Sequence, residues 1–141
     1  MTSTTKDRAQ CLIVKGLNVL MVQQSHDDRS YWCLPGGGVE DGETPEQAAV
    51  RELKEECSLN ALELKKVSTI HYLESVHHTF LITSYEGSLK TGYDPELASH
   101  KQIIRTVAWK HIDELSKLDF ALVAAGGLTT NRQVYLHLGK F

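Results

Sequence analysis

The order of apolar and polar positions divides the chain into short strands on either side of one amphipathic helix. Residues 11–24 (CLIVKGLNVLMVQQ) carry two apolar runs separated by Gly16 and Asn18, which predicts two strands joined by a turn. Three later segments mix β-branched and other apolar residues with polar ones, and each predicts a further strand. These segments are residues 61–74, 77–87 and 101–110.

Helical segments and loops complete the pattern. Residues 112–125 (IDELSKLDFALVAA) predict one or two short helices, and residues 132–141 fit a strand or a helix equally well. Residues 25–30 and 88–100 predict loops between these elements. The resulting order is several strands, a central helix, more strands and late helices. It predicts a mixed α/β fold in which helices cover both faces of a sheet.

The central helix is predicted to begin at Thr44, because three start signals agree there. Thr44 is a good N-cap residue, Pro45 suits the first helical position, and Gln47 completes a capping box. The residues that follow are mostly strong helix formers. Before the helix, residues 31–43 begin as a short strand that the three glycines Gly36–Gly38 interrupt. Three consecutive glycines are expected in neither a helix nor the interior of a strand.

Length, charge and cysteine content narrow the class of protein. The chain has 141 residues and a net charge of −3, which fits one domain and disfavours bulk nucleic-acid binding, since that requires a basic face. Residues 1–8 are predicted as a flexible N-terminal tail and residues 9–141 as a single domain. Its three cysteines form no paired pattern and no apolar stretch approaches bilayer length. We therefore expect free thiols, no membrane partner and a cytoplasmic protein.

Three glutamates share one face of the predicted central helix. On a helical wheel of about 100° per residue, Glu56 lies about 40° to one side of Glu52, and Glu55 about 60° to the other. Such an acidic face is either a solvated surface or a site for a cation. The apolar stripe that can pack on the sheet consists of Ala49, Val50, Leu53 and Cys57.

The composition of the acidic face favours the cation site. Like charges at i and i+4, as in Glu52 and Glu56, destabilise a bare helix by a few tenths of a kcal/mol, and Arg51 is the one cation beside them. Carboxylate oxygens suit Mg²⁺ or Mn²⁺, and protein-bound Mg²⁺ usually also contacts substrate phosphates. The glycines at 36–38 let the backbone approach a metal or a phosphate, although they also suit a tight turn.

Residues 37–59 resemble the signature of the Nudix hydrolases, G-x5-E-x7-R-E-U-x-E-E-x-G-U, where U is an aliphatic residue. The chain supplies Gly37, Glu43 and the run Arg51–Glu56, and it departs from the signature at the last glycine, where Ser58 stands. The preceding WCLPGG also resembles the family's lead-in. The resemblance implies a Nudix-type α/β/α sandwich with a mixed sheet and a loop–helix–loop, in a MutT-like protein.

The resemblance also implies an activity and its cofactor. Nudix enzymes hydrolyse a pyrophosphate bond in a nucleoside diphosphate linked to another group X, with water attacking phosphorus and Mg²⁺ or Mn²⁺ as cofactor. The implied partner is a nucleotide substrate, with no stable nucleic-acid partner. The identity of X, and whether the protein is a monomer or a homodimer, stay open. A non-catalytic nucleotide-binding or sensor domain with the same fold is the alternative.

Site roles follow from the resemblance residue by residue. Metal ligation falls on the carboxylates of Glu52, Glu55 and Glu56, together with the backbone carbonyl of Gly36. Arg51 is expected to hold the glutamates through charge-assisted hydrogen bonds. The expected catalytic set is therefore Glu43, Arg51, Glu55 and Glu56, with Glu43 tying the loop to the helix and reaching Arg51.

The general base and the substrate contacts lie outside this pattern or vary within the family. The base is either a box glutamate or a later acid, for which Glu96 is the candidate, and Gln102 stands in a stretch where many relatives carry an acid. Arg29 is a candidate for substrate phosphate. Tyr31 and Phe80 are candidates for stacking on a base, although aromatic residues on strands are more often core residues.

Ser58 is the point at which the signature fails. A serine in the left-handed conformation that ends many helices costs roughly 1 kcal/mol relative to glycine. Asn60 tolerates that conformation, so we expect it to take over the turn. Because the expected metal ligands precede Ser58, we expect a local change in the loop and retained activity.

Overall fold

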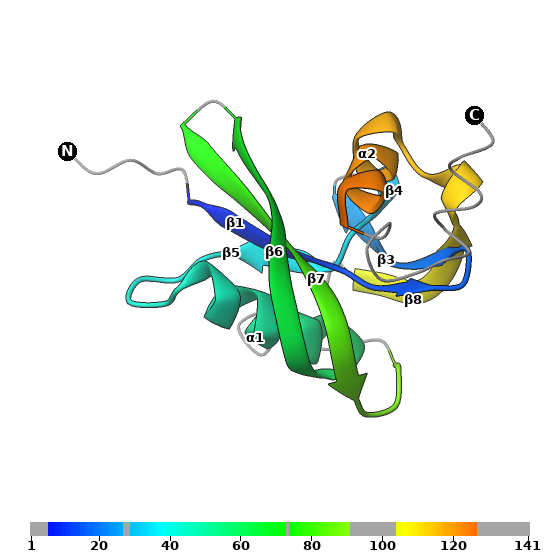
Figure 1. Ribbon diagram of the computed structural model, residues 1–141, viewed down its shortest axis with the longest axis horizontal. Coiled ribbons are helices and arrows are strands. Elements are labelled where there is room, and N and C mark those ends of the chain that lie inside the picture. The colour runs from blue at the N-terminus through cyan, green and yellow to red at the C-terminus, as the bar shows by residue number, and fades with distance from the viewer. Residues whose placement is uncertain (1–5, 27–28, 73, 91–103, 127–141) are drawn as a thin grey trace.

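Two four-stranded sheets form the centre of the molecule, with a helix on either side (Figure 1). The computed structural model describes residues 6–26, 29–72, 74–90 and 104–126. The first sheet has the spatial order β5 (Gly36–Gly38), β1 (Arg8–Leu12), β7 (Ser75–Glu86) and β6 (Asn60–Tyr72). The second sheet contains β2 (Val14–Lys15), β3 (Asn18–His26), β4 (Arg29–Cys33) and β8 (Ile104–His111). The helices are α1 (Pro45–Cys57), the short 3-10 helix η2 (Ile112–Glu114) and α2 (Lys117–Gly126).

Strand pairing makes the first sheet mixed and links the two sheets through one chain segment. β1 runs parallel to β7 and antiparallel to β5, while β3 pairs antiparallel with β2, β4 and β8. The chain passes from β1 to β2, and so from one sheet to the other, at the buried Ile13. The predicted turn between the first apolar runs is present, with Gly16 at φ 63° joining β2 to β3.

Side chains alternate between two cores along the strands, as the period of a β-strand requires. In β1, Cys11 packs in the core that α1 closes, and the next residue, Leu12, packs in the core that α2 closes. β7 repeats the pattern with Phe80 on the α1 side and Leu81 on the α2 side. The predicted α/β/α arrangement is therefore confirmed. The α1 stripe in this core consists of Ala48, Ala49, Leu53 and Cys57, so the prediction was wrong at Val50, whose place Ala48 takes.

The predicted start of α1 is confirmed in detail. The Thr44 hydroxyl accepts a hydrogen bond from the Gln47 amide at 3.1 Å, and the Gln47 side chain accepts one from the Thr44 amide at 2.9 Å. Pro45 is the first helical residue. This capping box satisfies two of the backbone donors that a helix start leaves without partners, and so fixes where α1 begins.

The three glycines before α1 form a short strand, which corrects the prediction that they break one. Gly36–Gly38 is β5 and pairs with residues 8–10 of β1. The physical reason is close approach, because a Cβ at Gly36 would lie 2.4 Å from the Ala9 carbonyl oxygen. The predicted loop at residues 25–30 is also shorter than expected, since β3 extends to His26 and β4 begins at Arg29.

Ser58 itself adopts the left-handed conformation at the end of α1, with φ 61° and ψ 29°. Its amide donates to the Lys54 carbonyl at 3.0 Å. The prediction that Asn60 takes over this turn is wrong, because Asn60 already pairs with Glu86 as the first residue of β6. The turn therefore keeps the geometry of a glycine cap without the glycine.

Contacts with the rest of the domain begin before residue 9, where the predicted boundary between the N-terminal tail and the domain lies. Arg8 begins β1, and the carboxylate of Asp7 accepts a hydrogen bond from the Val76 amide at 3.0 Å. The Asp7 carbonyl accepts another from the Val39 amide at 2.8 Å. The predictions for Glu96 and Gln102 and for residues 132–141 lie outside the described residues.

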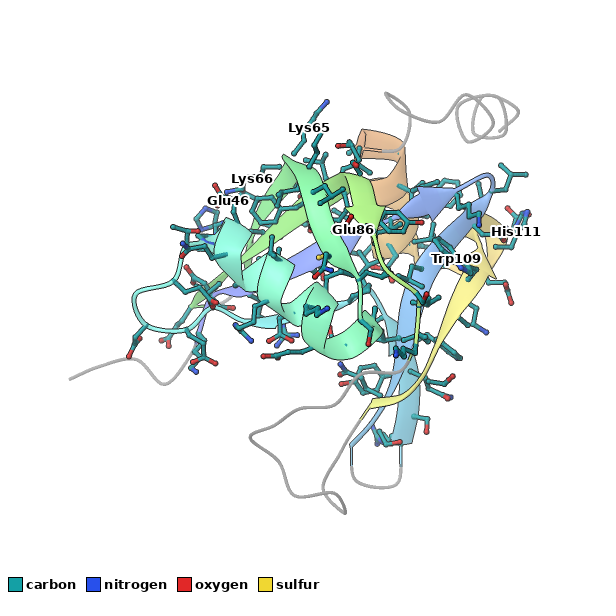
Figure 2. All side chains as sticks on the ribbon, turned by 90° about the horizontal axis from the view of Figure 1, so that it is seen from below. Glu46, Lys65, Lys66, Glu86, Trp109 and His111 are labelled. Carbon is teal, nitrogen blue, oxygen red and sulfur yellow. The ribbon has the colours of Figure 1, made fainter. Side chains whose placement is uncertain are left out.

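β6 lies at an edge of the first sheet and carries features that discourage pairing with another chain. Lys65 and Lys66 are exposed and project away from the sheet (Figure 2). Its pairing with β7 shifts register at three places. Charged side chains and bulges both interrupt the regular ladder that an added strand would need.

Replacing Gly36 with alanine is expected to destabilise the fold by about 1–3 kcal/mol, because the new methyl group meets the backbone of β1. Urea unfolding followed by circular dichroism measures the change. Gly38→Ala is the matched control, since its Cβ would lie 3.2 Å from Cδ of Lys6, which can move. Equal stability of the two variants would contradict this account of β5.

Replacing Ser58 with glycine is expected to stabilise the protein by about 0.5–1 kcal/mol, because glycine adopts the left-handed conformation without Cβ strain but loses more entropy on folding. The same unfolding measurement applies. Ser58→Ala keeps the Cβ and removes the hydroxyl, so it should bring no stabilisation. A gain of similar size in both variants would assign the effect to the hydroxyl instead.

Candidate active site

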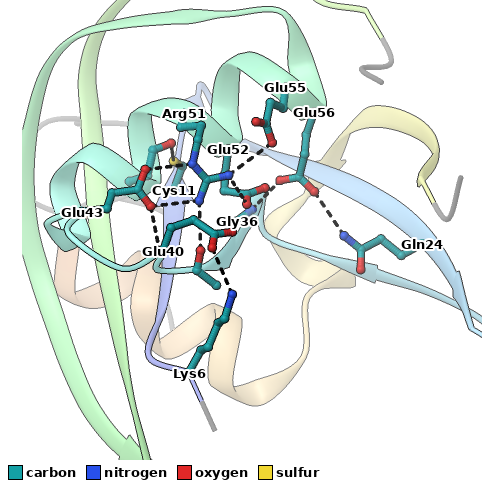
Figure 3. A network of polar contacts seen from close by, with 12 residues as sticks. Lys6, Cys11, Gln24, Gly36, Glu40, Glu43, Arg51, Glu52, Glu55 and Glu56 are labelled. Carbon is teal, nitrogen blue, oxygen red and sulfur yellow. Dashed lines mark hydrogen bonds and ion pairs between the residues drawn. The ribbon is translucent and has the colours of Figure 1, made fainter. Parts of the chain in front are cut away.

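Arg51 lies at the centre of a polar network formed by α1 and the loop before it (Figure 3). Its Nε and Nη2 donate to the two oxygens of Glu43 at 2.8 and 3.0 Å, a bidentate pairing. Its Nη1 donates to Oε1 of Glu52 at 2.8 Å and to Oε2 of Glu55 at 3.3 Å. Nη2 also donates to the Gly38 carbonyl at 3.0 Å. One guanidinium thus ties three carboxylates and the glycine strand together.

These contacts set the charge state of the pair at the loop–helix junction. The hydrogen bonds from Arg51 hold the pKa of Glu43 below its usual range, so the carboxylate is charged at neutral pH. The hydrogen bond to Glu43 likewise raises the pKa of Arg51, which stays protonated. The contact between Glu43 and Arg51 that the resemblance implies is therefore present.

Glu56 is held by a different set of donors. Its side chain is buried, with the residue only 2% exposed. Oε1 accepts a hydrogen bond from the Gly36 amide at 2.6 Å, and Oε2 accepts one from Nε2 of Gln24 at 3.1 Å. Burial raises the pKa of Glu56 to about 8, the charge of Glu52 adds to the rise, and the bonds from Gly36 and Gln24 oppose it.

The donor set on this face fits a hard divalent cation. Carboxylate oxygens are the ligands that Mg²⁺ and Mn²⁺ prefer. Gly37 leaves room beside them, because a Cβ there would lie 2.4 Å from Oε1 of Glu52. In this conformation, no three His, Cys, Asp or Glu side chains of the described residues are grouped as a metal site. Ligation of one cation by Glu52, Glu55 and Glu56 together therefore requires side-chain rotation, and the predicted role of the Gly36 carbonyl stays a prediction.

The residues predicted to contact substrate differ in whether a substrate can reach them. Tyr31 is 47% exposed, and its hydroxyl donates to Oε1 of Gln24 at 3.2 Å, which connects it to Glu56. Arg29 is exposed at the start of β4, two residues before Tyr31. Phe80 is 1% exposed and packs in the α1 core, so it is a core residue and is not available to stack on a base. Glu96 lies outside the described residues.

Gln24 is the site residue that the sequence analysis missed. It continues the alternation of β3 in which Leu20 and Val22 face the α1 core, so it is a polar residue at a position that points inward. A polar residue at such a position needs a hydrogen-bond partner. This break in the apolar alternation is the signal that could have identified it.

A small pocket of about 190 Å³ lies on the opposite side of the second sheet. It includes Trp32, whose ring has the Lys110 ammonium 4.1 Å from its centroid. Because Trp32 and Met21 pack in the α2 core, the sheet separates this pocket from the face that carries Gln24 and Tyr31. The remaining lining residues are Glu114, Leu115, Ser116 and Asp119.

Comparison with known proteins agrees with the fold. A sequence profile of the NUDIX domain matches residues 5–129. The chain belongs to the NUDIX domain family. Among solved structures, a MutT NUDIX hydrolase from Burkholderia pseudomallei superposes with a TM-score of 0.70, covering 88% of this chain and 99% of that one at 17% identity. At this low sequence identity, the likeness shows only that the two NUDIX chains have the same fold. Within the described residues, no helix is long and apolar enough to cross a membrane.

Curated relatives match the NUDIX chain over part of its length. An 8-oxo-dGTP diphosphatase from Proteus vulgaris is 40% identical over 63 residues, which is 42% of this chain and 56% of that protein. An RNA pyrophosphohydrolase from a Wolbachia of Drosophila simulans is 50% identical over 48 residues, which is 33% of this chain and 30% of that protein. The matches thus span little more than half of the first relative and under a third of the second.

Replacing Glu43 with glutamine is expected to destabilise the protein by about 1–2 kcal/mol at pH 7. This is toward the lower end for charged hydrogen bonds, because the pair is partly exposed. Since folding lowers the pKa of Glu43, its stabilisation is complete above the unfolded pKa of about 4.3 and is lost as pH falls through the folded pKa. Urea unfolding between pH 7 and pH 3 should therefore show the two proteins converging in acid.

Glu46→Gln is the control for that experiment. Glu46 is exposed on the first turn of the same helix and should contribute only a few tenths of a kcal/mol through the helix dipole. A difference between wild type and Glu43→Gln that stays constant across the pH range would contradict a charged Glu43–Arg51 pair.

Proposed function

We propose that this NUDIX protein is a divalent-metal-dependent pyrophosphohydrolase that acts on a nucleoside diphosphate linked to another group, with nucleoside triphosphates as the substrate class. The observation that carries the proposal is the carboxylate face of α1. Arg51 binds Glu52 and Glu55 there, and Glu56 is held beside them by the glycine strand. Family membership supports the same chemistry.

The chain's own groups divide the work of this reaction. Glu52, Glu55 and Glu56 would hold Mg²⁺ or Mn²⁺. Arg51 orients Glu52 and Glu55, and the bonds from Gly36 and Gln24 orient Glu56. A bound cation would neutralise charge on the pyrophosphate and would make water a better nucleophile near neutral pH. Water attacks one phosphorus, and the bond from that phosphorus to the bridging oxygen breaks. The products are a nucleoside monophosphate and the phosphorylated group X, which is inorganic pyrophosphate when the substrate is a nucleoside triphosphate.

The general base is proposed to be Glu55, with Glu96 as the alternative. Both oxygens of Glu56 accept hydrogen bonds from neighbouring groups, and its residue is 2% exposed. The Glu55 side chain is 28% exposed, so a water and a substrate can reach it. A general base must lie within hydrogen-bond reach of the proton that it removes.

Two considerations support nucleoside triphosphates as the substrate class. A relative named as an 8-oxo-dGTP diphosphatase matches 42% of this chain, and the other relative is named as an RNA pyrophosphohydrolase. The first name specifies a nucleoside triphosphate, and the second specifies hydrolysis of a pyrophosphate in RNA. On this chain, Tyr31 and Arg29 are exposed and two residues apart on β4, and we propose that they contact the base and the phosphates respectively.

A panel of phosphate esters tests the activity and names group X at the same time. It contains the dNTPs, 8-oxo-dGTP, 5′-triphosphorylated RNA, ADP-ribose, dinucleoside polyphosphates, NADH and a nucleotide sugar, each with Mg²⁺, with Mn²⁺ and with EDTA. Metal-dependent release of a phosphate monoester from a nucleoside triphosphate is the expected result. Tight binding of a nucleotide and a metal without any turnover would instead favour the sensor domain.

Replacing Glu56 with glutamine is expected to lower kcat at least about 100-fold while the protein stays folded, because one metal ligand loses its charge. Steady-state kinetics with the best substrate of the panel measures the loss, and circular dichroism checks the fold. Glu46→Gln on the exposed first turn of α1 is the matched control and should leave kcat unchanged. Full turnover by the Glu56 variant would remove Glu56 from the proposed metal site.

A further inference from the structure

A line of hydrogen bonds connects the molecular surface to Glu56. Tyr31 on β4 and Gln24 on β3 are direct cross-strand partners, and both side chains face α1. The Tyr31 hydroxyl donates to Oε1 of Gln24 at 3.2 Å, and Nε2 of Gln24 donates to Oε2 of Glu56 at 3.1 Å (Figure 3 shows the second contact). The exposed fraction falls along this line, from 47% at Tyr31 to 9% at Gln24 and 2% at Glu56.

The two contacts of Gln24 agree in one orientation of its amide. The NH₂ end of Gln24 faces Glu56. This orientation suits the ionised, cation-binding form of Glu56, because an ionised carboxylate accepts hydrogen bonds and donates none. The carbonyl end then faces Tyr31, whose hydroxyl is a donor as well as an acceptor. If the amide rotated by half a turn, its oxygen would meet the carboxylate and repel it. The Tyr31 hydroxyl therefore stabilises the orientation that Glu56 requires.

Gln24 gives Glu56 a support that the Arg51 network does not supply. Arg51 donates to Glu43, Glu52 and Glu55, whereas Glu56 accepts hydrogen bonds from Gly36 and Gln24. The Gly36 contact fixes one oxygen of Glu56, and a single contact leaves the carboxylate free to turn about it. The second contact, from Gln24, fixes the plane of the group.

We propose that Gln24 is a positioning residue for Glu56 and that the Tyr31 hydroxyl sets the direction of the Gln24 amide. This inference rests on the proposed function for its kinetic consequence, although the hydrogen-bonded line itself does not. Groups that orient a metal ligand typically change metal affinity or activity 10–100-fold when they are removed. The line also links the carboxylate to Tyr31, the exposed residue where a substrate would first touch it.

The first test replaces each member and measures both metal affinity and turnover. Gln24→Met keeps the length of the side chain and removes the amide, and it should weaken Mn²⁺ binding and lower kcat by about 10–100-fold, with KM changed less than about threefold. Tyr31→Phe removes only the hydroxyl and should lower kcat by a smaller factor. Calorimetric titration of the nucleotide-free protein with Mn²⁺ measures affinity without any turnover. Gln23→Met is the matched control, because Gln23 lies on the same strand and faces the other side of the sheet.

The second test asks whether Tyr31 acts through Gln24. If it does, Tyr31→Phe should have no further effect on kcat or Mn²⁺ affinity in the Gln24→Met background, so the two changes will not multiply. If Tyr31→Phe changed KM equally in both backgrounds, Tyr31 would act only by contacting the substrate. That result would overturn the proposal that Tyr31 acts through Gln24. Unchanged Mn²⁺ affinity and kcat in Gln24→Met would overturn the role of Gln24.

A third measurement separates this inference from the proposed function. Urea unfolding of the metal-free wild type, the two single variants and the double variant measures the coupling between Gln24 and Tyr31 directly. Coupling of about threefold or more in the unfolding equilibrium constant supports the line of contacts even if no pyrophosphate is hydrolysed, in which case only the proposed function fails. Additive effects on stability in an active enzyme would overturn the inference and leave the function in place.

Discussion

The Arg51 guanidinium is the interaction on which the candidate site depends. It places positive charge between Glu43, Glu52 and Glu55, which would otherwise repel one another on a short stretch of helix and loop. Its bond to the Gly38 carbonyl extends this support to the glycine strand. Because the fork of a guanidinium has fixed geometry, lysine could not serve the same three carboxylates and a carbonyl at once. Arg51 therefore offsets the repulsion between these carboxylates and holds them in fixed positions.

Close backbone approach is the second constraint, and it explains the glycines better than turn formation does. At Gly36 a Cβ would meet the backbone of β1, and at Gly37 it would meet the carboxylate of Glu52. The approach at Gly36 also brings its amide to Glu56 at 2.6 Å. The short strand β5 therefore forms one edge of the first sheet, and its Gly36 amide donates a hydrogen bond to the buried carboxylate of Glu56. Larger residues at Gly36 and Gly37 would push β5 away from β1 and from the carboxylate of Glu52.

Local sequence signals predicted the features that depend on neighbouring residues. The capping box at Thr44, the start of α1 and the hairpin at Gly16 all follow from residues within a few positions of one another. The strand formed by Gly36–Gly38 was not predicted, because its stability comes from pairing with β1, far away in the sequence. Local propensity carries no information about that pairing.

The same distinction explains the errors at individual side chains. Phe80 was a candidate for stacking because an aromatic residue on a strand can face either way. Its register against β1 and β6 places it in the α1 core. Asn60 was expected to end the helix because of its own tolerance of the left-handed conformation. Pairing with Glu86 holds it in β6, so the strain falls on Ser58. In both cases strand register decided between options that local chemistry left open.

Contacts between residues close in the sequence and contacts between distant residues also have separate roles in the candidate site. Arg51, Glu52 and Glu55 lie within five residues of one another on α1, so a short motif is enough to specify their mutual contacts. Glu56 extends toward β3 and β5, and its two donors, Gln24 and Gly36, are separated from it by 32 and 20 positions along the chain. A buried carboxylate with a raised pKa tolerates few errors in the placement of those donors, because unsatisfied charge in a low dielectric is expensive. The helix therefore provides the carboxylates, while the packing of two sheets against it determines how the most buried one is oriented.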